Sequence, residues 1–193
     1  MAAEATPQNW TLEVKGTMMI PTSSQVKDFL GMCCNVDGEV EFGWLYKNRF
    51  NFTVSTGMSY SSGDAVGIRS GLASGDKFSL MLIPVRLDFI YRFDYTSDQL
   101  FLPYLRVGGD TVIFRESTDG NSIMNFKLGF HGGAGVGILL DRAEPPGYAL
   151  ESEIGVNDVY IIIEARYAMI NSFKSSGLDL SGIYPYLGVL FEF

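Results

Sequence analysis

The sequence has no hydrophobic run that could cross a membrane as a helix. It contains no stretch of the 18 or more apolar residues that mark a transmembrane helix. Yet hydrophobic residues make up 47% of its 193 residues, and the mean hydropathy is +0.14. The longest apolar stretches, Ser79–Val85 and Val159–Ile163, have the length of strands. The composition therefore excludes a helical membrane protein and calls for another use of these hydrophobic residues.

Cysteine, histidine and cationic residues are also scarce. The 14 lysines and arginines face 22 aspartates and glutamates, a net charge of −8, which makes nucleic acid an unsuitable partner. The two cysteines, Cys33 and Cys34, are adjacent and cannot join distant segments, so free thiols are favoured over a vicinal disulfide. His131 is the single histidine. A metal site is therefore not expected, nor is any other cofactor.

What the sequence does have is a long alternation of apolar and polar residues. In Phe50–Tyr60, for example, every second residue from Phe50 to Val54, and again Met58 and Tyr60, is apolar or aromatic. Such a period of two is typical of strands with two different faces. It predicts eight strands, at Trp10–Ile20, Glu39–Lys47, Phe50–Tyr60, Phe78–Phe93, Leu100–Phe114, Asn125–Leu139, Asp158–Ile170 and Tyr184–Phe193.

The connections between these segments alternate in length. Long polar or glycine- and serine-rich connections are expected at Pro21–Gly38, Ser61–Lys77, Arg115–Met124 and Asn171–Gly182, and two of the three between them are short. The third, with the sequence PPGYALESEIG, is longer and could form a short helix after Pro145 and Pro146. Long connections at one end and mostly short turns at the other are typical of an up-and-down transmembrane barrel with extracellular long loops.

Alternation alone does not say which face is inside, because a lipocalin-like barrel has the apolar face inward and a membrane barrel has it outward. Aromatic residues on the apolar face gather near the strand ends, as in the aromatic girdle of a membrane barrel. The opposite face carries charges and many glycines, which suits the narrow interior of eight strands. The girdle is predicted to include Trp10, Trp44, Tyr46, Phe50, Tyr91 and Phe93.

The charged residues on the inward face nearly balance. Because side chains fill an eight-stranded interior, we expect these groups to pair with one another in a structural network, with a narrow channel as the alternative. Inward glycines of the sixth segment would make room for large neighbours such as Tyr104, Tyr160 and Arg166. The predicted network comprises Glu13, Lys15, Glu39, Glu41, Arg86, Asp88, Arg92, Arg106, Asp110, Lys127, His131, Glu164, Arg166 and Glu192.

The chain ends inside its last predicted strand, YPYLGVLFEF. Leu187, Val189, Phe191 and Phe193 match the alternating signal, with a final Phe, that the barrel-assembly machinery reads in small Gram-negative outer-membrane barrels. The whole chain resembles that group, of the OmpA, OmpX and OmpW kind. The stretches LDRAEPPGYALESEIGVND and LSG…LGVLFEF also resemble outer-membrane barrels of deltaproteobacterial type.

The resemblance implies one all-β domain over residues 1–193, an eight-stranded antiparallel up-and-down transmembrane β-barrel in the bacterial outer membrane. Both termini would lie in the periplasm. The start, MAAEATPQ, has no signal-peptide pattern and is compatible with an exported mature chain. Implied partners are outer-membrane lipid and lipopolysaccharide, the assembly machinery, and an envelope or extracellular component that contacts the long loops.

Three functions follow in order of expectation. The first is a structural or surface-interaction barrel, and the second is a small OmpW-like channel for small or apolar solutes. The third is a lipid-modifying enzyme with His131 as base, Glu164 as orienting residue and Ser55 or Ser59 as nucleophile. We expect no catalytic residues, because His131 lies among glycines on the inward face and no recognised nucleophile motif accompanies it.

Overall fold

A computed structural model describes residues 9–22, 35–66, 73–96, 99–118, 121–140, 155–172 and 179–193. It confirms the prediction of an all-β, eight-stranded antiparallel barrel. Cys33, Cys34 and the helix expected after Pro145 and Pro146 lie outside the described residues. The strands are β1 (Trp10–Pro21), β2 (Asn35–Tyr46), β3 (Phe50–Val66), β4 (Ala73–Arg92), β5 (Phe101–Thr118), β6 (Asn121–Leu139), β7 (Asp158–Ile170) and β8 (Gly182–Glu192).

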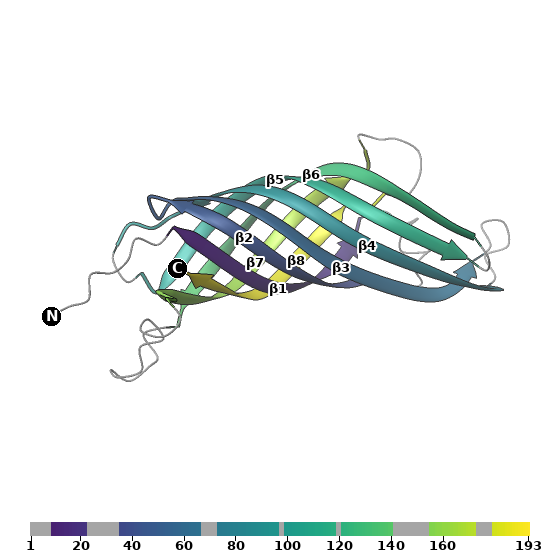
Figure 1. The fold of residues 1–193 in the computed structure, drawn as a ribbon, viewed down its shortest axis with the longest axis horizontal. Coiled ribbons are helices and arrows are strands. Elements are labelled where there is room, and N and C mark those ends of the chain that lie inside the picture. Colours follow the sequence, from purple (N-terminus) through teal and green to yellow (C-terminus); the bar gives the residue numbers. More distant parts are fainter. Residues whose placement is uncertain are drawn as a thin grey trace.

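Each strand pairs with its neighbours in sequence, and β8 pairs with β1 to close the barrel (Figure 1). The last residue takes part in the closure, since the Phe193 amide donates to the Trp10 carbonyl at 2.9 Å. The Phe193 carbonyl in turn accepts from the Asn9 amide at 2.9 Å. Closure therefore leaves no free strand edge at the chain end.

The middle strands are longer than the sequence predicted. β3 to β6 have 17 to 20 residues, although a tilted strand crosses a bilayer with about 9–11. They extend the barrel at the end opposite the termini, called the far end here (Figure 1).

The expected connections were therefore wrong in several places. Most of Ser61–Lys77 and Arg115–Met124 is strand, because β3 pairs with β4 as far as Val66 and β5 pairs with β6 as far as Thr118. The connection expected over Pro21–Gly38 is shorter as well, because β2 already begins at Asn35. Glycine and serine weaken the intrinsic strand preference, but pairing with a neighbouring strand overrides it.

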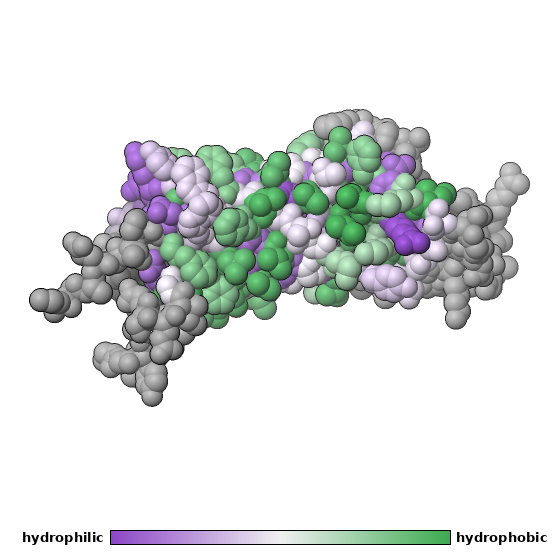
Figure 2. Space-filling view, viewed as in Figure 1, coloured by the Kyte–Doolittle hydropathy of each residue, from purple (hydrophilic) through white to green (hydrophobic). Residues whose placement is uncertain are grey.

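The two faces of the sheet differ in polarity. Apolar side chains on the outside are exposed, as for Val14, Phe52 and Leu105, whereas alternate charged residues are buried inside. Hydrophobic side chains extend across the middle of the visible surface, with hydrophilic ones toward its ends (Figure 2). A surface of this kind fits lipid rather than water, so the barrel is of the transmembrane type. Among the described residues, no helix is long and apolar enough to span a membrane.

Candidate functional site

The interior of the barrel holds a layer of charged side chains at mid-height. Alternation along the strands turns these side chains inward, and pairing in register brings them to similar levels. All fourteen residues of the predicted network are buried: Glu13, Lys15, Glu39, Glu41, Arg86, Asp88, Arg92, Arg106, Asp110, Lys127, His131, Glu164, Arg166 and Glu192. Most of them belong to this layer, but Arg92 and Glu192 lie nearer the termini, and Lys127 is the register partner of Val112 toward the far end.

Two glutamates of β2 lie at the centre of the layer. Glu41 accepts from the Lys15 ammonium at 2.5 Å and from Arg106 Nη1 at 2.9 Å. Glu39 accepts a hydrogen bond from Arg86. Its Oε1 atom also lies 3.5 Å from Lys15 Nζ and 3.4 Å from Arg166 Nη1. Each carboxylate therefore faces cations from more than one neighbouring or opposite strand.

The layer closes into one connected network through β5, β6 and β7. Glu164 accepts from Arg166 and lies 2.8 Å from Arg106 Nε. Asp110 accepts from Arg86 Nε at 3.0 Å and contacts His131 Nδ1 at 2.9 Å. These contacts link both sides of the barrel wall across the interior. Buried ions of both signs are thereby compensated, which an interior of low polarity requires.

Glycines allow side chains of strands that are not adjacent to meet. Gly108 of β5 lies between Asp88 of β4 and His131 of β6 in the register. The two flanking side chains lean over it, and Asp88 Oδ1 lies 2.5 Å from His131 Nε2. A Cβ atom at Gly108 would lie 2.7 Å from both side chains, which is too close for either to stay in place. Glycine is therefore required at this level of β5.

The same arrangement recurs one strand further along. Gly135 of β6 lies between Tyr104 of β5 and Glu164 of β7. The Tyr104 hydroxyl crosses over it and donates to Glu164 at 2.6 Å. A Cβ atom at Gly135 would collide with the Tyr104 ring. The glycines of β6 thus make space for partners of the charged layer.

His131 has a carboxylate at each ring nitrogen. Nδ1 faces Asp110 and Nε2 faces Asp88, and both carboxylates can only accept when ionised. An imidazole satisfies both only as the cation, which donates from both nitrogens. Glu164, the orienting residue of the enzyme hypothesis, is instead bonded to Arg166 and Tyr104. Both ring nitrogens are engaged by carboxylates, so neither is free to act as a base toward a substrate.

Apolar layers cover the charged layer on both sides, and the sequence reasoning missed them. Toward the far end lies a cluster of Met19, Leu80, Leu82, Val112, Phe114, Ala168, Ile170, Leu180, Tyr184 and Tyr186. Toward the termini lies a cluster of Ile90, Leu102, Tyr104, Leu139, Tyr160, Ile162 and Leu190. Their signal was present in Ser79–Val85 and Val159–Ile163, where apolar residues occupy both parities and so both faces of the strand.

Tyrosines lie at the two boundaries of the charged layer. The Tyr186 ring lies 4.1 Å from the Arg166 guanidinium carbon and 5.5 Å from Lys15 Nζ. On the opposite side, Tyr104 belongs to the apolar cluster while its hydroxyl bonds to Glu164. Each ring therefore presents an apolar body to one layer and a polar contact to the other.

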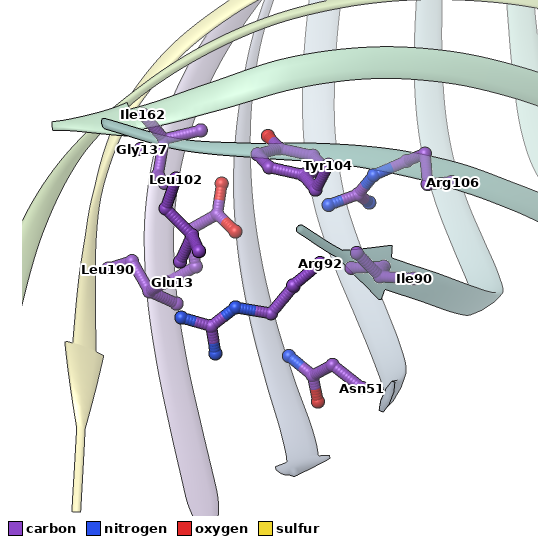
Figure 3. Close-up of a pocket in the computed structure, with 10 residues that line it drawn as sticks. All are labelled: Glu13, Asn51, Ile90, Arg92, Leu102, Tyr104, Arg106, Gly137, Ile162 and Leu190. Atoms are coloured by element: carbon purple, nitrogen blue, oxygen red, sulfur yellow. The ribbon is translucent and has the colours of Figure 1, made fainter. Parts of the chain in front are cut away.

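A second ion pair lies nearer the termini, next to a small cavity. Arg92 donates a hydrogen bond to Glu192. The cavity has a volume of about 20 Å³, which holds one water molecule. Arg92, Glu13 and Asn51 line it beside Leu102 and other apolar groups (Figure 3). Arg92 Nη1 and Asn51 Oδ1 lack hydrogen-bond partners among the described residues, whereas Glu13 Oε1 lies 3.3 Å from Lys15 Nζ.

The other predicted residues lie on the outside near the termini. Rings of the predicted girdle contact one another: Trp44 contacts Tyr46, and Phe50 contacts Tyr91. Trp10 is 48% exposed and Phe93 is partly exposed. The residues of the predicted assembly signal share the outer face of the last strand, where Leu187 is exposed and Val189, Phe191 and Phe193 are half-buried.

The fold matches solved outer-membrane barrels at low sequence identity. No family model matches the sequence, and no curated protein sequence is similar to it. OprG of Pseudomonas aeruginosa superposes with a TM-score of 0.66 at 12% identity over 96% of each chain. Neisserial surface protein A gives 0.58 at 18% identity, over 95% of this chain and 97% of its own. Ail of Yersinia pestis gives 0.53 at 12% identity, over 97% and 100%. The predicted resemblance to small outer-membrane barrels is confirmed for the fold.

Proposed function

We propose that the protein is a closed outer-membrane barrel with a structural or surface-interaction role, with its termini in the periplasm and its far end outside the cell. The observation that carries this is the layered interior. A charged network, itself internally paired, lies between two apolar clusters of buried side chains. Eight strands enclose an interior only wide enough for side chains, and here these side chains fill it.

The channel alternative receives less support. An ion-conducting path needs a lumen that water can fill. Here an ion leaving the charged layer would meet Leu80, Leu82 and Phe114 on one side and Leu102 and Leu190 on the other. The fold shared with OprG does not decide the matter, since one fold serves many functions.

An enzymatic role also receives less support. His131, its strongest candidate, is 3% exposed and is engaged by two carboxylates. Ser55 and Ser59, the nucleophiles of that hypothesis, are buried as well, so a substrate would have to reach the interior through the apolar clusters. The proposal therefore assigns His131 to the structural network.

The far end is the part suited to contact with other molecules. The projecting residues of β6, Ser122 to Phe126, are all exposed, and they include Ile123 at 62% and Met124 at 71%. Exposed apolar side chains on both faces of a strand are typical of interaction surfaces. Two proteins of the same fold are named a surface protein and an attachment invasion locus protein, which is compatible with such a role.

The proposed orientation can be tested with two single cysteines in a background of Cys33→Ser and Cys34→Ser. Asn48→Cys lies in the exposed turn between β2 and β3 at the end with the termini, and Ser122→Cys lies at the far end. A membrane-impermeant maleimide should label Ser122→Cys on intact cells. It should label Asn48→Cys only after the outer membrane has been permeabilised. The opposite pattern would show that the far end faces the periplasm and would overturn the proposed orientation.

A further inference from the structure

The turn between β2 and β3 places two cations next to exposed aromatic rings. Lys47 Nζ lies 5.2 Å from the centre of the Tyr46 ring, and the Arg49 guanidinium carbon lies 5.1 Å from that of Tyr95. Arg49 Nε also donates to the Asp94 carbonyl at 3.0 Å, which fixes the guanidinium over the neighbouring connection. Both side chains are exposed, so their charges face outward from the end of the barrel.

Below this turn, aromatic rings in contact with one another form a continuous surface over β2 to β4. Phe52 contacts both Trp44 and Phe89, at centroid distances of 6.0 and 5.2 Å. Phe50 contacts Phe89 and Tyr91, at 6.0 and 5.4 Å. The rings face the lipid side of the wall, directly beneath the two cations along the strands.

Cations are rare on the rest of the described surface. Where side-chain exposure is described, the exposed cations are Lys47, Arg49 and Arg115, because the others are buried in the interior. Two of the three occur in one turn at one end, whereas Arg115 lies toward the far end. In a chain of net charge −8, this turn is a local positive site on a negative molecule.

We propose that the turn and the aromatic surface beneath it bind an anionic phospholipid of the adjacent leaflet. Lys47 and Arg49 contact the headgroup phosphate, and an acyl chain lies along Trp44, Phe52 and Phe89. The proposal rests on the membrane location proposed above but not on the orientation. Aromatic rings at a membrane interface lie at the level of the lipid headgroups, and basic residues close to this level attract anionic lipid. The pairing of both features on one wall distinguishes this site from a uniform girdle.

The two tryptophans of the chain make the site observable. Trp10 and Trp44 are cross-strand neighbours and lie on this wall, so intrinsic tryptophan fluorescence reports the lipid bound there. The barrel is refolded into phosphatidylcholine vesicles with one-fifth phosphatidylglycerol, in which either the anionic or the zwitterionic lipid is brominated at the same mole fraction. Each basic residue near a surface should raise the relative affinity for anionic lipid about fivefold at low salt.

Brominated phosphatidylglycerol should therefore quench the wild-type protein more than brominated phosphatidylcholine. The variant Lys47→Gln/Arg49→Gln should lose the difference, whereas Arg115→Gln should keep it. Equal quenching in the wild type would leave a protein, rather than lipid, as the partner of the turn and would overturn the proposal. If Arg115→Gln also abolished the difference in quenching between the two lipids, anionic lipid would be attracted by the overall charge of the barrel and not bound at this turn. A wild type without heat-modifiable gel migration has not inserted, which would contradict the membrane location itself. Variants are compared only in preparations whose migration shows that they have inserted.

Discussion

Replacement of Arg106 by methionine should lower the free energy of unfolding by about 3–5 kcal/mol. Arg106 is 2% exposed and lies within 3.5 Å of oxygens of Glu41, Asp88 and Glu164. Methionine has a similar length, so the loss comes mainly from carboxylates left without a cation rather than from a cavity. Unfolding by guanidinium in detergent, followed by the shift between folded and unfolded forms on gels, measures the change.

Arg115→Met is the matched control, because Arg115 is exposed and on the same strand. Its effect should stay within about 0.5 kcal/mol. If Arg106→Met and Arg115→Met changed the stability equally little, the charged layer would not depend on compensation by Arg106. The interior would then have to hold enough water to solvate the carboxylates, contrary to the packed layers described above.

Deletion of Phe193 should lower the amount of folded barrel in the outer membrane far more than it lowers the stability of barrel that folds in detergent. Burial of one aromatic side chain contributes at most about 1.5–3 kcal/mol, and Phe193 is only half-buried. The proposed recognition by the assembly machinery, in contrast, would act before the barrel has folded. Levels in cell envelopes and refolding yields in detergent, measured for the same variant, separate the two effects.

Trp10→Ala is the control for this deletion. Trp10 is an exposed aromatic residue at the same end, and its carbonyl accepts from the Phe193 amide, but it lies in the first strand. It should alter envelope levels no more than it alters refolding. A deletion of Phe193 that impaired detergent refolding as severely as envelope levels would show that Phe193 is a structural residue and not a signal.

The number of strands, and the face of each strand that points outward, could be predicted because apolar and polar residues alternate along the sequence. The alternation of Phe50 to Tyr60 is one example, and the structure exposes most of its apolar residues and buries most of its polar ones. Strand ends were predicted less well, since Ser61–Val66 and Arg115–Thr118 owe their conformation to pairing with a neighbour. A prediction from alternation also assumes that each strand has one polar face and one apolar face. It therefore overlooked Leu80 and Leu82, which are apolar residues inside the barrel.

The alternation along each strand predicts which charged residues point into the barrel. It does not predict which of them contact one another. That Asp88 meets His131 across Gly108 depends on the register of three strands. That register is fixed by pairing along whole strands and by the closure of the barrel, which no local pattern encodes. For the same reason, the sequence alone could not predict that Glu41 pairs with Lys15 and Arg106.

Planar-bilayer recording tests the central claim, that two apolar layers and a paired charged layer close the interior. Purified barrel inserted into a bilayer should give no discrete conductance steps, even at high applied voltage and high salt. Insertion must be verified in the same preparation by heat-modifiable migration. Reproducible unitary steps from verified barrels, increased by Leu80→Ala or Leu102→Ala, would show a path through these layers and would contradict the account.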